Sequence, residues 1–176
     1  MSRLAIAALL LATAAVPALA LAGPELVAFP AEYQKTFTLY NRIERPDRSP
    51  AAVRFMYAQP AAIAEAKPGQ PIPYGTVLIM EDRKVLIGLD GQPVRDAEGR
   101  MVTTDEVTAV AVQEKRPGWG EAYPADKRNG EWEYAAFNPD GTRRAVSTAG
   151  CFACHTDRRG RDFSFVFAKV ILDTKK

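Results

Sequence analysis

Cysteine and histidine are scarce in this sequence, whose 176 residues include two cysteines and one histidine. A structural zinc site takes about four such ligands, so this supply falls short of one. A charge excess of one sign is also lacking, since 23 basic residues stand against 21 acidic ones. That balance argues against a nucleic-acid partner, which calls for a concentrated basic face. The one local basic run, Arg158-Arg159-Gly160-Arg161, is read as a solvated turn or as a docking spot for an acidic partner or an anionic cofactor edge.

Long hydrophobic runs are confined to the start of the chain. Arg3 precedes an apolar run over residues 4–22, which ends in small residues that fit an A-x-A cleavage site twice, at 18–20 and 20–22. This plan is typical of a secretory signal peptide, with an uncleaved membrane anchor as the alternative. Cleavage after Ala22 would leave a single domain over residues 23–176. We therefore expect an exported, periplasmic protein with no membrane segment after cleavage.

All of the scarce side chains gather in one pentapeptide near the C-terminus, Cys151-Phe152-Ala153-Cys154-His155. C-x-x-C-H is the attachment signature of c-type haem, in which each thiol adds to a vinyl group and the histidine ligates the iron. A redox disulfide is the first alternative, but the βαβ context of thioredoxin-like proteins is absent. Zinc is the second, and it lacks a fourth ligand. The pentapeptide thus predicts one haem c, attached through Cys151 and Cys154, with His155 as its iron ligand.

The rest of the chain reads as short strands separated by Pro- and Gly-rich turns. Aromatic spacing predicts a short amphipathic helix that begins near Pro30 and ends before Glu44. β-branched and apolar patterns predict strands. Short helical turns are expected near 61–67 and around the cysteines, and 162–172 is compatible with strand or helix. The strands are placed at 52–58, 75–87, 106–115 and 131–139, the last ending in a turn at Asp140-Gly141, with an exposed hairpin tip at 90–100. The fold class is α+β.

Four segments, in order, resemble the cytochrome P460 family, which includes the β-type cytochromes c′. They are FPAEYQKTFTLYNRI, VRFMYAQPAA, PIPYGTVLIME and CFACHTDRRGRDFSFVF, and they span most of residues 29–167. The resemblance implies a five-stranded, mainly antiparallel sheet with a few short flanking helices and a C-terminal haem motif. It also implies a homodimer and one covalently attached haem held by Cys151, Cys154 and His155.

One departure from the family pattern concerns a lysine that is cross-linked to the porphyrin in hydroxylamine-oxidising members. Aligning Gly75-Thr76-Val77 places Met80 at that position, and a thioether cannot form the bond. Lys84 lies about 13 Å farther along the strand. We therefore expect no cross-link. Met80 is a core residue, a haem contact or a distal sulfur ligand, and Thr76 and Leu78 share its strand face.

Weaker candidates lie on the neighbouring strands. Arg54 could pair with a haem propionate, or it could be a solvated charge. Phe55 and Tyr57 could cap the iron, although strand aromatics usually pack in the core. Glu114 and Glu133 could relay protons if they reach the pocket; surface positions are the alternative.

The sequence thus predicts a periplasmic mono-haem cytochrome. It would exchange electrons with a redox partner protein or bind a small diatomic or nitrogen-oxide ligand such as nitric oxide. The alternative is an enzyme that oxidises hydroxylamine. The sequence identifies no catalytic residue, so enzymatic activity stays open.

Overall fold

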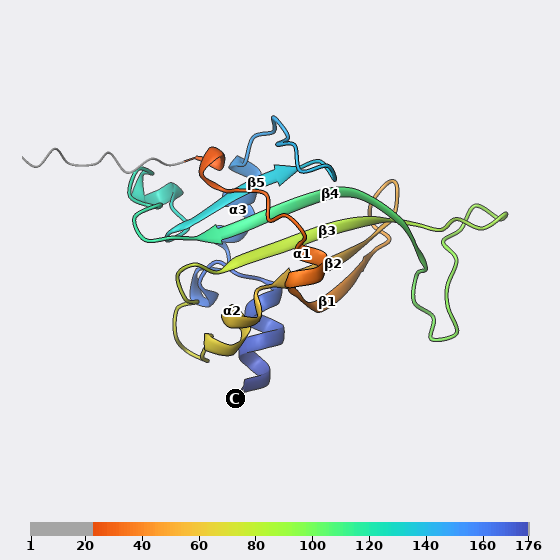
Figure 1. The fold of residues 1–176 in the computed structure, drawn as a ribbon, viewed down its shortest axis with the longest axis horizontal. Helices are drawn as coiled ribbons and strands as arrows, with labels where there is room; N and C mark the ends of the chain where they lie inside the picture. The colour runs from red at the N-terminus through yellow and green to blue at the C-terminus, as the bar shows by residue number, and fades with distance from the viewer. Residues whose placement is uncertain (1–22, 176) are drawn as a thin grey trace, which may run out of the picture.

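One antiparallel sheet dominates the computed structural model, which describes residues 23–175 (Figure 1). Its five strands follow one another in the order β1-β2-β3-β4-β5, so each strand pairs with the one before it. The α+β class and the five-stranded antiparallel sheet are confirmed, whereas the predicted leader lies outside the described residues. The strands are β1 (Thr38–Arg45), β2 (Ala52–Ala58), β3 (Val77–Val85), β4 (Thr103–Lys115) and β5 (Trp132–Phe137).

The helices are short and lie at the ends of strands or after the sheet. α2 begins at Pro60, in the first turn, where a missing N–H costs no helical bond. None of the helices in residues 23–175 has the length and apolar character needed to cross a membrane. They are η1 (Pro24–Leu26), α1 (Tyr33–Thr36), α2 (Pro60–Glu65), η2 (Ala125–Lys127), α3 (Ala149–Thr156), η3 (Arg159–Arg161), η4 (Ala168–Leu172) and η5 (Asp173–Lys175).

The two faces of the sheet are covered by opposite ends of the chain. In Figure 1 the N-terminal segment with α1 crosses in front of the sheet, while α3 and the C-terminal helical turns lie behind it. We call these the N-terminal face and the α3 face. Because side chains alternate along a strand, Ile79 packs on the N-terminal face and Leu78 on the α3 face.

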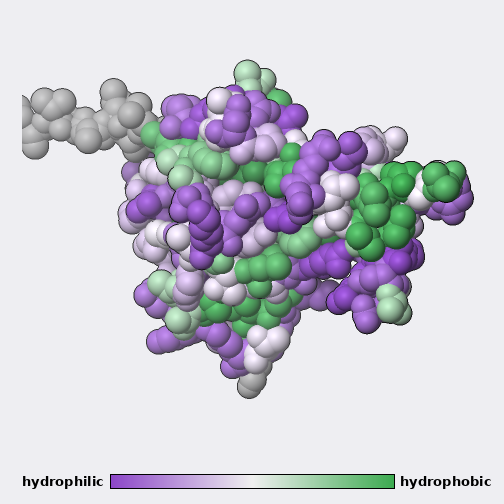
Figure 2. Space-filling model, turned by 45° about the vertical axis from the view of Figure 1, so that its right-hand side comes forward, coloured by the Kyte–Doolittle hydropathy of each residue, from purple (hydrophilic) through white to green (hydrophobic). Residues whose placement is uncertain are grey.

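The connection from β3 to β4, residues 86–102, projects beyond the sheet as an arm (Figure 1). Backbone hydrogen bonds such as Val94 N to Leu86 O hold it in two narrow turns. Leu86, Ile87 and Leu89 are exposed on this arm, and Figure 2 shows apolar surface gathered there. The predicted hairpin tip lies within this arm.

The strand predicted at 52–58 coincides with β2, and the helical turn near the cysteines is α3. The predicted helix is too long, because α1 ends at Thr36 and β1 begins two residues later. The aromatics of that segment do not share one face: Phe37 packs on the N-terminal face, whereas Tyr40 packs on the α3 face. β3 ends at Val85 rather than at residue 87. The segment left open, 162–172, is helical toward its end, in η4.

Candidate functional site

A cavity of about 490 Å³ lies between the α3 face of the sheet and the chain around α3. Its volume falls within the roughly 300–1,000 Å³ of cofactor and ligand sites. One wall comes from α3 and the segment after it, with Gly150, Cys151, Cys154, His155 and residues 164–167. The opposite wall comes mainly from the strands, with Tyr40, Ile43, Arg54, Met56, Leu78, Met80, Ala111, Gln113 and Tyr134 among its residues.

Helix α3 brings both thiols to this cavity. Cys151 and Cys154 lie three positions apart on the helix, which places them on one side of it. Both are free thiols, and Cys154 is the more exposed of the two. Burial raises the pKa of Cys151, which disfavours the reactive thiolate that a thiol-redox centre requires.

His155 is held by a hydrogen bond that fixes the role of each ring nitrogen. Nδ1 lies 2.7 Å from the carbonyl oxygen of Phe163, and because a carbonyl can only accept, Nδ1 carries the proton. Nε2 then keeps its lone pair, which is the arrangement of metal-ligating histidines. Burial lowers the pKa of His155, against the opposing effect of this hydrogen bond, and so favours the neutral ring. The rings of Tyr134 and Phe165 flank it at 4.9 and 5.0 Å between centroids.

The Phe163 carbonyl is placed by a tight turn. Asp162 and Phe163 both have positive φ, at 49° and 56°, a conformation that few non-glycine residues adopt. Asp162 Oδ2 accepts from Lys115 Nζ at 2.6 Å and from the Ile72 amide at 2.8 Å. Gln113 Nε2 donates to the same Phe163 carbonyl at 3.2 Å. The end of β4 thereby sets the position of the histidine's partner.

Asn129 ties α3 to the sheet. Its Nδ2 donates to the Phe152 carbonyl at 2.9 Å and to the Tyr134 hydroxyl at 3.1 Å, while its Oδ1 accepts from Thr156 at 2.8 Å. It is 1% exposed, so these partners satisfy a buried amide. Sequence reasoning missed Asn129, because a single asparagine in a Pro- and Gly-rich loop carries no pattern.

The sheet side of the cavity is largely apolar and contains two thioethers. Met80 lines it, and so does Leu78 on the same strand face; Thr76 is buried but is not part of the lining. Met56 lines it too, directly opposite Met80 in the β2–β3 pairing. Sequence reasoning missed Met56, since strand register is not visible in the sequence.

Arg54 reaches the cavity, but its guanidinium group is already paired. Its Nε and Nη2 lie 2.8 and 2.9 Å from the two oxygens of Asp82, its cross-strand neighbour. Arg48 approaches the same carboxylate at 3.5 Å, and Arg45 pairs with Asp47. All three arginines line the cavity, so its rim is basic and only partly neutralised.

A buried hydroxyl lacks a partner in the same wall. Tyr40 Oη makes no hydrogen bond to any of the residues described, and burial raises its pKa well above the ordinary value. Together with the basic rim, it offers the polar contacts that the edge of an anionic cofactor needs. The residues present therefore fit haem: two thiols, a neutral imidazole nitrogen, an apolar wall and a cationic rim.

Four residues weighed as weaker candidates lie outside the cavity lining. The core alternative holds for Phe55 and Tyr57, whereas the surface alternative is wrong for Glu114 and Glu133, which are buried. Phe55 and Tyr57 pack on the N-terminal face, because Arg54 and Met56 take the α3 face of β2. Glu114 and Glu133 lie outside the cavity lining as well, and Glu114 pairs with Arg116. Lys84, the lysine nearest to Met80 in sequence, pairs with Glu106 at 3.0 Å and does not line the cavity.

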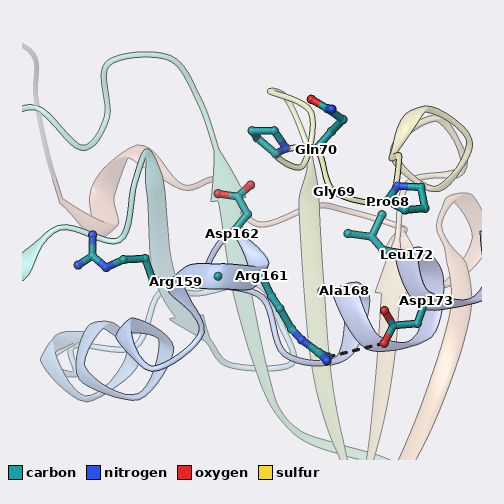
Figure 3. A pocket seen from close by; sticks show the side chains of 11 residues that line it. Pro68, Gly69, Gln70, Arg159, Arg161, Asp162, Ala168, Leu172 and Asp173 are labelled. Carbon is teal, nitrogen blue, oxygen red and sulfur yellow. Dashed lines mark ion pairs between the residues drawn. The ribbon is translucent and has the colours of Figure 1, made fainter. Parts of the chain in front are cut away.

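The basic run after the motif is engaged within the protein. Arg158 stacks over Phe165 at 4.5 Å and Arg159 over Phe163 at 5.3 Å. A second cavity, of about 510 Å³, lies beside this run (Figure 3). In Figure 3, Arg161 reaches toward Asp173, with which it pairs at 3.8 Å. These contacts favour a structural role for the run over a docking site.

The five-stranded antiparallel sheet thus carries helix α3, with its Cys-x-x-Cys-His sequence, on one face. The sequence model of the family described as cytochrome P460 matches residues 30–166. The chain therefore belongs to the cytochrome P460 family, and it is a haem-binding cytochrome. A search of curated proteins found no match.

Proposed function

We propose that the protein is a periplasmic mono-haem c-type cytochrome that binds a small nitrogen-oxide ligand such as nitric oxide, or passes electrons to a redox partner protein. One observation carries the proposal: His155 turns its unprotonated Nε2 away from the Phe163 carbonyl, in the same wall as Cys151 and Cys154. Haem supplies an iron that binds diatomic ligands or changes oxidation state. Cys151 and Cys154 would anchor it, and His155 would ligate it.

The nature of the wall favours ligand binding or electron transfer over oxidation of hydroxylamine. That oxidation releases protons as well as electrons, so it needs a group that accepts them near the iron. Within the described residues, the cavity lining includes no carboxylate and no lysine. Met56, Leu78, Met80 and Ala111 offer an apolar surface instead, which suits a small neutral ligand.

Whether Met56 or Met80 ligates the iron distinguishes the ligand-binding function from the electron-transfer function. If Met80 or Met56 ligates the iron, the site is closed to gases and the reduction potential rises, which suits electron transfer. If neither does, the sixth position is open. Absence of a lysine cross-link, implied by Met80, fits either function but not the cross-linked enzyme.

Electronic spectra of the exported protein test the proposal. We expect ordinary c-type bands in the reduced protein, a high-spin oxidised spectrum, and a shift on adding nitric oxide. Met80→Ala and Met56→Ala should leave the oxidised spectrum unchanged. A sulfur-to-iron charge-transfer band that disappears in one of these variants would instead assign electron transfer. Hydroxylamine turnover with a displaced, cross-link-type reduced band would overturn the proposal.

We also propose that the protein is a homodimer, as its family resemblance implies. The exposed side chains of Leu86, Ile87 and Leu89 on the arm support this, because contiguous apolar surface often marks an interface. Light scattering of the wild type and of Leu89→Ser tests it. A monomeric wild type would contradict it.

A further inference from the structure

Glu133 is a buried carboxylate that the haem site does not use. It is 0% exposed and lies on β5, on the N-terminal face of the sheet. Within residues 23–175 its Oε2 has no hydrogen-bond partner. A buried carboxylate without a cation is costly, so it points to a missing positive group.

The group that faces Glu133 is the backbone nitrogen of Gly23. This nitrogen lies 3.3 Å from Glu133 Oε1, and Gly23 itself is buried. Arg143 holds the following segment in place through the carbonyls of Pro24 and Val27. The nitrogen of Gly23 is therefore held at the carboxylate by its own hydrogen bond and by the contacts of the segment that follows it.

Gly23 also directly follows the second of the two A-x-A patterns, which ends at Ala22. We propose that the mature protein begins at Gly23 and that its α-ammonium group forms a buried ion pair with Glu133. Hydrolysis of the Ala22–Gly23 bond by a signal peptidase consumes one water and leaves a carboxylate on Ala22 and an ammonium on Gly23. The inference rests on the proposed export. It selects the cut after Ala22 over the cut after Ala20, which would leave two residues ahead of the anchored nitrogen.

The surroundings of Glu133 agree with a cation at this point. While the Gly23 nitrogen is an amide, burial raises the pKa of Glu133, against the opposing effects of Tyr123 and the Gly23 N–H. Glu25 adds to the rise, and Glu114 lies opposite on β4 but is neutralised by Arg116. An ammonium group has three N–H donors and a full positive charge. It can therefore donate to the unpartnered Oε2 and offset the cost of burying the Glu133 carboxylate.

Intact mass and N-terminal sequencing of the protein exported from its full-length precursor give the first test. We expect a single chain beginning at Gly23. A chain beginning at Leu21, or one that keeps its leader, overturns the inference. Haem content, measured on the same sample, reports the proposed function separately. A protein that carries haem but begins at another residue would overturn this inference and leave the proposed function standing.

The ion pair is tested with a precursor that has one serine inserted between Ala22 and Gly23. After cleavage at Ala22 the extra residue moves the ammonium away and leaves Glu133 intact. We expect the melting temperature to fall by about 5 °C or more, as for the loss of a buried ion pair. Glu133→Gln should lower it in the protein that begins at Gly23, but much less in the protein with the extra serine. Additive losses would contradict the pairing.

The pH dependence gives a readout that a packing role would not produce. Pairing raises the pKa of the ammonium above its unfolded value of about 7.7–8.0. The added stability is then present below that value and is lost as pH rises through the raised pKa. Labelling of the α-amine at pH 7 should be at least about tenfold slower than in the serine-inserted protein, as for a one-unit rise in pKa. Equal labelling rates would overturn the ion pair.

Discussion

The two faces of the sheet differ in how completely they are filled. On the N-terminal face, aromatic rings interlock: Tyr33 meets Tyr57 edge-on at 5.4 Å, and Phe29 meets Phe137 at 5.4 Å. On the α3 face, methionines and arginines surround a cavity of about 490 Å³. Both faces come from the same five strands, so each strand contributes alternately to a closed core and to an open site.

This difference separates stability from function along single strands. A close-packed face tolerates no loss of volume, because the cavity that is left forfeits contacts. A face that already borders a cavity loses little when a side chain is shortened. Neighbouring residues on one strand should therefore respond very differently to the same substitution.

Lys115→Met should have the largest effect, because it removes one partner of a buried pair. Lys115 and Asp162 are 6% and 17% exposed at their side chains. The unpaired carboxylate should cost about 3–5 kcal/mol of unfolding free energy, measured by urea denaturation. The turn that holds the Phe163 carbonyl should also loosen, which perturbs the spectrum of the iron ligated by His155.

The double variant Lys115→Met with Asp162→Asn is the control for this experiment. Without a buried charge it should recover part of the lost stability. Failure to recover any stability would show that the lysine acts through packing on Trp132 and Tyr74 rather than through its charge.

Ile79→Ala and Met80→Ala form a matched pair on adjacent positions of β3. Ile79 is 0% exposed on the N-terminal face, and its truncation should cost about 2–5 kcal/mol. Met80 borders the cavity, and its truncation should cost about 1 kcal/mol or less, since little packing is lost. Thermal denaturation with haem absorbance as a second signal measures both. Equal losses would contradict the contrast between the faces.

Tyr33→Phe removes a hydrogen bond to the buried Glu81 carboxylate at every pH, and its distinctive effect on the pH dependence of stability should appear under alkaline conditions. Burial, followed by the hydrogen bond to Glu81, raises the pKa of Tyr33. Stability linked to this group is complete below the unfolded pKa of about 10 and declines as pH rises above it. The wild type should lose up to about 1.4 kcal/mol of unfolding free energy per pH unit in this range, and the variant should lack this part of the decline. Identical alkaline slopes for the two proteins would show that Tyr33 ionises freely in the fold.

The sequence was informative where rare residues or strict alternation set the structure. β2 was predicted at its observed bounds, because apolar and aromatic residues run up to Pro60, which ends the strand. Cys151, Cys154 and His155 were recognised because three scarce side chains occur at one fixed spacing. The aromatic residues of 33–40 predicted too long a helix, since their spacing does not reveal that Phe37 and Tyr40 pack on opposite faces of the sheet.

The remaining site residues depend on pairing between distant segments. Met56 meets Met80 only through the β2–β3 register, and Asn129 meets α3 from 23 residues away. The partner of His155 is a backbone carbonyl, which any residue type could supply. Glu133 was weighed as a proton relay or as a surface carboxylate, whereas the structure buries it against Gly23.

The mass of the exported protein after complete unfolding tests the central claim most directly. Two thioether bonds through Cys151 and Cys154 survive denaturation, so we predict the mass of the mature polypeptide plus one haem, with colour retained. Replacing both cysteines with serine should return the mass of the polypeptide alone. A colourless wild-type chain at the bare polypeptide mass would contradict the account.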